Sequence, residues 1–226
     1  MVNYYILNIS DINFDNIRDK WNNKFNRPIT KVIKYNNPKD KLRSLSGEII
    51  VRYALQQNYG ILPTQEFLYH EKGKPFLPID NIHFNISHSG DWVVCCTANN
   101  KVGIDVEKIR KNKLKVATRF FSEREIDYLT NIVENKQDEE FTRLWTIKES
   151  YLKYLGTGLT KALNTFTTIK KDNSFHLYDK NDLLKEKIYS RKIDKENFIA
   201  ICHNNEEINI EPQKVTFDQL HEFISQ

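Results

Sequence analysis

The sequence lacks the features that would place the protein in a membrane or outside the cell. No apolar run is long enough to span a bilayer, and residues 1–7 carry no basic segment followed by an apolar core and a cleavage site. The three cysteines, Cys95, Cys96 and Cys202, lie inside apolar runs and not at the spacing of metal ligands. We therefore expect buried, reduced thiols in a cytoplasmic protein that has no membrane partner, and a first strand in residues 1–7.

A strong charge of either sign is also missing. The net charge of +4 over 226 residues does not indicate a nucleic-acid partner, and a polyanionic small molecule or an acidic protein would fit it as well. The composition, 39% hydrophobic and 28% charged, is that of a soluble globular protein. A chain of this length can bury about 70% of its unfolded surface, either as one large domain or as two small ones.

Two carboxylates project from one side of a predicted strand. In residues 102–107 apolar residues alternate with Gly103, Asp105 and Glu107, which is the period of a strand whose two sides face different environments. Successive residues on the same side lie about 7 Å apart, close enough for Asp105 and Glu107 to share one divalent cation. The alternative is the solvated face of an edge strand.

A third carboxylate lies on a predicted helix about forty residues later. Apolar residues between 141 and 155 follow helical spacing, and Trp145, Glu149 and Lys153 form a second stripe at four-residue steps. Glu149 could complete an oxygen-rich magnesium site with the two strand carboxylates, and Lys153 would then face substrate phosphates. The alternative is an exposed ion pair on the helix, worth about 0.2–0.5 kcal/mol.

Other segments predict structural elements. A helix is expected from Pro38 through Asn58, and Gly47 inside it indicates the close approach of another backbone. Ser122 and Glu125 form a capping box, so we assign Glu125 no catalytic role. Alternating segments predict strands at 166–169, 175–177, 187–189 and 198–202. The last of these resembles residues 92–96, which suggests two similar halves.

The motifs together resemble those of the Sfp-type 4'-phosphopantetheinyl transferases, which prime carrier proteins of peptide, polyketide and fatty-acid synthesis. The resemblance spans roughly residues 40–165. It rests on the carboxylate strand 102–107, the helix segment Trp145–Lys153, Gly73-Lys74-Pro75, the run from Phe84 to Gly90, Phe121-Ser122-x-x-Glu125, and Gly156-x-Gly158-Leu159.

The resemblance implies an α+β fold of two similar subdomains, related by a pseudo-two-fold axis, with the active site in the cleft between them. Residues 1–103 would form the N-terminal α+β subdomain and hold the nucleotide end of coenzyme A. Residues 104–226 would form the C-terminal α+β subdomain, with the metal site and the carrier docking surface. A single-chain monomer is expected, because the small trimeric transferases of the superfamily are about half this size.

The resemblance also implies an activity: transfer of the 4'-phosphopantetheine group from coenzyme A to a serine of an apo acyl or peptidyl carrier protein, with release of adenosine 3',5'-bisphosphate. Mg²⁺ would be held by Asp105, Glu107 and Glu149. Glu149 would act as the general base, and Lys153 would stabilise the phosphates, with assistance from Lys148. The residues expected to bind coenzyme A are Lys31, Arg43, Lys74, Pro75, Ser87, His88 and Lys153, and Arg43 is expected at its 3'-phosphate.

Three other functions share parts of this pattern. A magnesium-dependent nuclease also uses an acidic trio with a lysine, but it requires a broad basic track for nucleic acid. A non-catalytic module that binds coenzyme A or a carrier has no need of three converging carboxylates. Ser87 next to His88 invites a hydrolase interpretation, which is weak because the Gly-x-Ser-x-Gly elbow is absent and adjacent strand side chains diverge.

A basic run follows the carboxylate strand, and it has two interpretations. It is either a solvated connection or a docking surface for the acidic helix of a carrier protein. Leu114, Val116 and Phe120 could add apolar contacts. The run consists of Lys108, Arg110, Lys111, Lys113 and Lys115.

Overall fold

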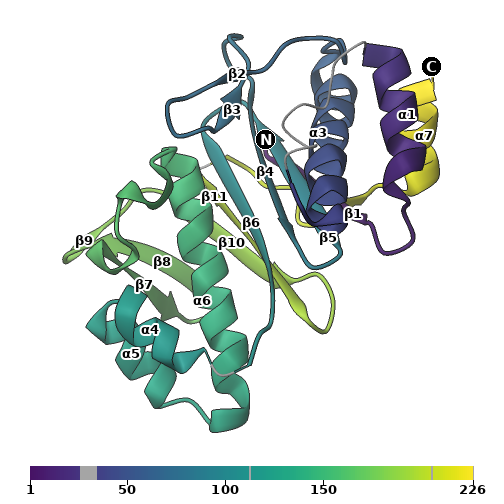
Figure 1. The fold of residues 1–226 in the computed structure, drawn as a ribbon. Coiled ribbons are helices and arrows are strands. Elements are labelled where there is room, and N and C mark those ends of the chain that lie inside the picture. The colour runs from purple at the N-terminus through teal and green to yellow at the C-terminus, as the bar shows by residue number, and fades with distance from the viewer. Residues whose placement is uncertain (26–34, 112, 205, 226) are drawn as a thin grey trace.

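The computed structural model describes residues 1–25, 35–111, 113–204 and 206–225. It is an α+β fold with two main sheets, each covered by a long helix (Figure 1). The first sheet has the strand order β12-β1-β5-β4, and the second has the order β6-β11-β10-β8-β7 with β9 paired to β8. Within the described ranges, no helix is both long and apolar enough to cross a membrane.

The first half is built around β1 and a long helix. Its elements are β1 (Asn3–Asn8), α1 (Phe14–Phe25), α3 (Pro38–Tyr59), the hairpin β2 (Leu68–Tyr69) and β3 (Pro75–Phe76), β4 (His83–Ser89) and β5 (Trp92–Ala98). Helix α3 begins as predicted, because the Asn37 side chain accepts a hydrogen bond from Lys39 N and Pro38 occupies the first turn. It ends at Gly60, which adopts the left-handed conformation.

The second half repeats this pattern with another 22-residue helix. Its elements are β6 (Val102–Lys108), α4 (Leu114–Phe120), α5 (Glu123–Thr130), α6 (Glu134–Leu155), two 3-10 turns (Gly158–Thr160 and Leu163–Thr165), β7 (Phe166–Lys171), β8 (Ser174–Asp179), β9 (Asp182–Leu183), β10 (Lys187–Lys192) and β11 (Asn197–His203). The predicted first strand, the helix ending before Gly156 and the four later strands are confirmed. The pseudo-two-fold axis stays a prediction.

The two halves are not consecutive pieces of chain. Residues 213–225 form β12 (Gln213–Lys214) and α7 (Phe217–Ser225), and β12 pairs with β1 of the first sheet. Leu220 and Phe223 of α7 lie in the same apolar core as Leu45 and Ile49 of α3, and α7 lies beside α1 (Figure 1). Residues 213–225 of the expected second subdomain, 104–226, therefore belong to the first half, because their apolar side chains are buried in its core.

Close backbone packing occurs at Gly103 and not at Gly47. A Cβ on Gly47 would lie 3.1 Å from Ile86 Cγ2, so the neighbour of that glycine is a side chain. A Cβ on Gly103 would lie 2.1 Å from Ser150 O and 2.3 Å from Tyr154 N. Strand β6 and helix α6 thus touch backbone to backbone, and only glycine fits at their closest point.

The expectation that Lys148 assists the reaction is wrong, because its side chain is part of the core. The residue is fully buried, and its Nζ lies 2.9 Å from Glu125 Oε1 and donates to Leu163 O and Phe166 O. The predicted capping box between Ser122 and Glu125 is confirmed. Glu125 therefore has two structural roles, because it caps α5 and neutralises a buried ammonium group.

Candidate active site

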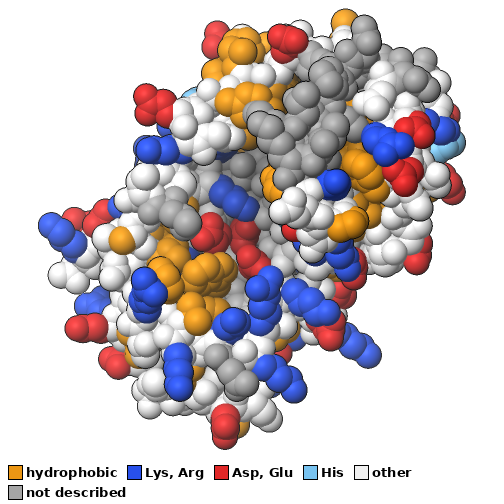
Figure 2. All heavy atoms as spheres, in the orientation of Figure 1, with side chains coloured by type: hydrophobic (Ala, Val, Ile, Leu, Met, Phe, Trp, Pro, Cys, Tyr) orange, Lys and Arg blue, Asp and Glu red, His pale blue; other side chains and the backbone are white. Residues whose placement is uncertain are grey.

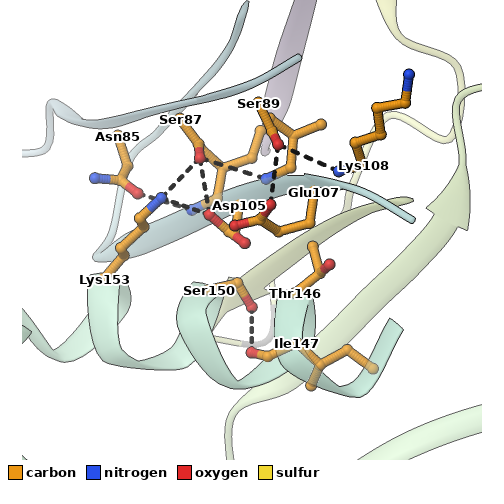
Figure 3. A network of polar contacts seen from close by, with 12 residues as sticks. Asn85, Ser87, Ser89, Asp105, Glu107, Lys108, Thr146, Ile147, Ser150 and Lys153 are labelled. Atoms are coloured by element: carbon orange, nitrogen blue, oxygen red, sulfur yellow. Dashed lines mark hydrogen bonds and ion pairs between the residues drawn. The ribbon is translucent and has the colours of Figure 1, made fainter. Parts of the chain in front are cut away.

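The two sheets meet where β4 and β6 run side by side (Figure 3). Side chains at every second position of β4 accept hydrogen bonds from backbone N–H groups at every second position of β6. The three bonds run to Asn85 Oδ1 from Ile104 (2.9 Å), to Ser87 Oγ from Val106 (3.4 Å) and to Ser89 Oγ from Lys108 (3.2 Å). This seam fixes the register between a strand of the first half and the strand that carries the carboxylates.

The same two serines bind the two carboxylates of β6. Ser87 Oγ donates to Asp105 Oδ1 at 2.8 Å, and Ser89 Oγ donates to Glu107 Oε2 at 2.9 Å. Asp105 is only 3% exposed, and its Oδ2 has no hydrogen-bond partner among the described residues. A buried carboxylate oxygen without a partner is costly, so this atom is suited to receive a cation or a donor from a ligand.

Lys153 reaches this seam from α6. Its Nζ donates to Asp105 Oδ1 at 2.6 Å and to Ser87 Oγ at 2.7 Å (Figure 3). Glu149 lies one helical turn earlier and lines the same cleft. The stripe predicted from the sequence therefore faces β6, and its exposed-ion-pair alternative is contradicted for Lys153, whose partner is on the strand.

The electrostatics of the carboxylates reflect their crowding. Burial, followed by the nearby charge of Asp105, raises the pKa of Glu107 to about 7. Burial and the charge of Asp105 also raise the pKa of Glu149, and Lys153 opposes that shift. Because the charge of Asp105 disfavours the charged forms of both Glu107 and Glu149, the site gains from a bound cation.

These residues line one cleft of about 640 Å³ between the two halves. Figure 2 shows acidic and basic side chains together in this hollow. The structure brings seven of the predicted site residues to it: Pro75, Ser87, His88, Asp105, Glu107, Glu149 and Lys153. Desolvation, with Lys153 and Arg43 nearby, lowers the pKa of His88. Lys31 lies outside the described residues.

Arg43 lies close to His88 but is engaged elsewhere. Its Nε donates to Gly90 O at 2.9 Å, and its Nη1 pairs with Asp40. The side chain is partly buried beside the turn that joins β4 to β5. Its expected contact with the 3'-phosphate of coenzyme A stays a prediction.

Lys74 does not lie at the tip of a turn, as its sequence context suggested. The tip of the β2–β3 hairpin is formed by the residues before it, where Gly73 N donates to His70 O and Gly73 has a positive φ of 82°. The ammonium group of Lys74 instead donates to two backbone carbonyls, Val102 O and Lys153 O. Of the Gly73-Lys74-Pro75 segment, Gly73 and Pro75 line the cleft.

The carboxylate oxygens in the cleft are of the kind that bind magnesium. Hard divalent cations take carboxylate oxygens, and Asp105, Glu107 and Glu149 present such oxygens to one cleft, including the unpartnered Oδ2 of Asp105. Among the described side chains, no three His, Cys, Asp or Glu groups are already close enough to hold a metal ion. The ammonium of Lys153 occupies the other oxygen of Asp105.

The sequence interpretation missed Asn85 and Ser89, which join the seam. A signal for both was present, because Asn85, Ser87 and Ser89 recur at every second residue and therefore share one side of β4. The partner strand could not be inferred from that alternation, because nothing local in the sequence places β4 beside β6.

A second hollow, of about 250 Å³, adjoins the cleft at Glu107 and Trp145. Its wall combines basic and apolar side chains, and Figure 2 shows basic side chains around a hydrophobic patch beside the acidic cleft. The lining residues are Glu107, Lys108, Arg110, Lys113, Val116, Phe141, Thr142 and Trp145. Part of the basic run thus faces this hollow.

Two family models and several known proteins are similar to this chain. Residues 101–206 match the family model described as 4'-phosphopantetheinyl transferase superfamily, and residues 26–100 match the model described as 4'-phosphopantetheinyl transferase, N-terminal. The chain is 42% identical over 163 residues to 4'-phosphopantetheinyl transferase gsp of Aneurinibacillus migulanus, covering 71% of this chain and 68% of the relative. It is 32% identical over 195 residues to 4'-phosphopantetheinyl transferase Sfp of Bacillus subtilis (strain 168), covering 84% and 86%. A Thermotoga maritima holo-[acyl-carrier-protein] synthase structure aligns with a TM-score of 0.39 and 22% identity over 45% of this chain and 61% of that chain.

Proposed function

The chain belongs to the 4'-phosphopantetheinyl transferases, as an Sfp-type member, and we propose that the cleft between its halves transfers 4'-phosphopantetheine from coenzyme A to a serine of an apo acyl or peptidyl carrier protein. The observation that carries the proposal is the convergence of Asp105, Glu107, Glu149 and Lys153 on one cleft. The family match supports the same reaction, which releases adenosine 3',5'-bisphosphate.

Glu149 is the proposed general base. Its carboxylate takes the proton of the carrier serine, directly or through a water, as the serine oxygen forms a bond to the phosphorus that bears pantetheine. The bond between that phosphorus and the bridging oxygen of the nucleotide breaks, and the electron pair leaves with adenosine 3',5'-bisphosphate. The raised pKa of Glu149, caused by burial and the charge of Asp105, supports this role, because it makes the carboxylate a stronger base.

Lys153 is the proposed cation for the phosphates. Its ammonium already lies in the cleft, held by Asp105 and Ser87, so it can stabilise charge on the leaving phosphate and donate a proton to it. Asp105, Glu107 and Glu149 are the residues that would hold Mg²⁺. When bound, this ion would neutralise the pyrophosphate and the charge that develops as its bond breaks.

The first half is proposed to bind the nucleotide end of coenzyme A, and the second to carry the metal and carrier sites. Pro75, Ser87 and His88 line the cleft from the first half, and Arg43 lies next to His88. We assign Arg43 to the 3'-phosphate, because a guanidinium offers paired donors to phosphate oxygens. Lys31 and Lys74 keep their proposed contacts with coenzyme A on the family resemblance alone.

The second hollow is the proposed docking site for the carrier protein. Arg110 and Lys113 give it positive charge, while Val116 and Trp145 give it an apolar floor. The hollow and the cleft share Glu107. A carrier helix docked in the hollow would therefore hold the serine beside it close to the carboxylates of the cleft. Charge of this kind increases the rate of encounter with an acidic carrier. In the competing interpretation the basic run is merely solvated, and reversing its charge would affect the carrier no more than an equal change of charge elsewhere on the surface.

We further propose that the protein acts as a cytoplasmic monomer without a nucleic-acid or membrane partner. All three cysteines lie in the described part of the chain, where they are buried and without a disulfide, which suits a reducing compartment.

The test is the intact mass of an apo carrier protein after incubation with this protein, coenzyme A and Mg²⁺, with a parallel sample that contains a chelator. A gain of one phosphopantetheine that disappears with the chelator is expected. A gain that persists with the chelator would remove the metal assignment. No gain across several unrelated carriers, despite measurable binding of coenzyme A, would instead favour a binding module.

A further inference from the structure

The ammonium group of Lys74 bridges the beginning of β6 and the end of α6. Its Nζ donates to Val102 O at 3.0 Å and to Lys153 O at 2.6 Å. The aliphatic part of the side chain passes Gly156, where an added Cβ would lie 3.9 Å from Lys74 Cδ. Lys74, a residue of the first half, is therefore bound to the carbonyl of Val102, which begins β6, and to the carbonyl of Lys153, whose side chain lies in the cleft.

The contact with Lys153 satisfies the end of a helix. The last four carbonyls of an α-helix lack an intrahelical partner, and in α6, whose C-cap is Gly156, these are the carbonyls of residues 153–156. Gly156 N donates to Leu152 O at 2.9 Å, and Lys74 donates to the next carbonyl, that of Lys153. A cation at this position also interacts favourably with the helix dipole. Lys74 thus stabilises the turn from which the Lys153 side chain projects.

The contact with Val102 lies at the tightest point of the strand–helix packing. The next residue along β6 is Gly103, whose missing Cβ allows Ser150 O and Tyr154 N to approach the strand. The two carbonyls that Lys74 binds belong to the neighbours of this contact, Val102 on the strand and Lys153 on the helix. Its ammonium therefore limits sliding of α6 along β6, which would move Glu149 and Lys153 relative to Asp105.

The hairpin that carries Lys74 also forms a wall of the cleft. Gly73 and Pro75, its neighbours in sequence, line the cleft, and its Nζ is anchored on the opposite half. The burial of this ammonium is costly and lowers the pKa of Lys74 to about 8. Lys72, two residues earlier in the same hairpin, is exposed. A lysine side chain in this hairpin can therefore remain in solvent instead of being buried.

We propose that Lys74 is a positioning residue for the transfer reaction: it holds β6, α6 and the β2–β3 hairpin in one arrangement, and so places Lys153 and Glu149 over Asp105. This inference rests on the proposed function of the cleft. The expectation that Lys74 binds coenzyme A stays a prediction; without coenzyme A, its ammonium is bound to two backbone carbonyls.

Hydrogen exchange of the free protein tests the bridge without any activity. Lys74→Met should speed the exchange of amides in residues 153–156 and 102–105, while Lys72→Met, the matched change in the same hairpin, should leave both segments unchanged. Equal exchange in the wild type and Lys74→Met would overturn the proposal. If Lys74→Met does not fold, Lys74→Gln, whose shorter amide cannot reach both carbonyls, is measured in its place.

Steady-state kinetics test the positioning role. We expect Lys74→Met to lower kcat about tenfold at saturating coenzyme A and carrier, because small misplacements of reacting groups are costly, with the Kd for coenzyme A changed less than about threefold. Lys74→Arg should restore most of kcat, since a guanidinium can donate to two carbonyls. A raised KM for coenzyme A with an unchanged kcat would overturn the proposal and make Lys74 a ligand. A wild-type protein that transfers nothing would refute the proposed function, whereas the exchange result would still decide whether the bridge exists.

Discussion

The Ser87 hydroxyl donates to Asp105 Oδ1 at 2.8 Å and accepts from Lys153 Nζ at 2.7 Å, so a single side chain of β4 connects the strand and the helix of the other half. Hydrogen bonds to charged groups contribute about 1.5–3 kcal/mol. We therefore predict that Ser87→Ala lowers kcat/KM about tenfold or more, measured by the rate of carrier modification.

Ser89→Ala is the matched control for this variant. Ser89 binds Glu107 and the backbone of β6 in the same way, but no bond to Lys153 involves it among the contacts of the described residues. A smaller loss of kcat/KM is expected for Ser89→Ala. Equal losses of kcat/KM in the two variants would show that these serines matter only because they hold β4 and β6 together.

Glu149→Gln separates binding from chemistry. The amide keeps the size of the side chain but cannot accept the serine proton, so we predict that kcat falls by a factor of about 10² or more. Calorimetric titration should give a Kd for coenzyme A close to that of the wild type. Glu139→Gln, on the same helix and paired with Lys192, serves as the control. Unchanged turnover in Glu149→Gln would remove it as the base.

Reversal of charge in the second hollow tests carrier docking. The double variant Arg110→Glu, Lys113→Glu should raise the KM for an acidic carrier about tenfold and weaken its salt dependence, because long-range attraction is lost. Binding of coenzyme A, measured separately, should not change. The double variant Lys185→Glu, Lys187→Glu, at two exposed sites in the β9–β10 connection and at the start of β10, is the control for the same change of net charge. An equal effect of both would support the solvated-run interpretation.

The buried pair of Lys148 and Glu125 predicts a loss of stability. Lys148→Met leaves the Glu125 carboxylate buried without its cation, which costs about 3–5 kcal/mol of unfolding free energy. Denaturant unfolding measures this loss. Lys192→Met breaks a half-exposed pair with Glu139 and should cost at most about 1 kcal/mol. Similar losses for both variants would contradict the buried pair.

The depressed pKa of Lys74 predicts how stability depends on pH. Its pKa is about 8 in the folded protein against an ordinary 10.5, so between these values the unfolded chain binds more protons. The contribution of Lys74 to the unfolding free energy therefore rises with pH across this window and is constant below it. The stability of the wild type relative to Lys74→Met should rise from pH 8 to pH 10. Cys96, Cys202, Lys101 and Lys153 are the titratable groups near it.

Features set by local pattern could be predicted from the sequence. The alternation around Asp105, the helix stripe of Glu149 and Lys153, and the capping box of Ser122 each depend on neighbours within a few residues. Their convergence on one cleft required the family resemblance, because about forty residues separate strand from helix.

Features set by contacts between distant segments could not be predicted. The pairing of Lys148 with Glu125, the carbonyl partners of Lys74 and the close approach at Gly103 all depend on how α6 lies on its neighbours. A lysine on a helix has the same sequence signature whether it points to solvent or into the core. Gly47 and Gly103 likewise looked alike as single glycines, and only packing distinguishes a side-chain neighbour from a backbone neighbour.

The return of residues 213–225 to the first half has a consequence for biosynthesis. On the ribosome, β1 lacks its β12 neighbour and α1 and α3 lack α7 until residue 225 has left the exit tunnel. The strands and helices from β6 through β11 are complete by residue 203. Domains generally fold from the N-terminus as they are made. Here the half that emerges first is the last to have all its strands and helices available.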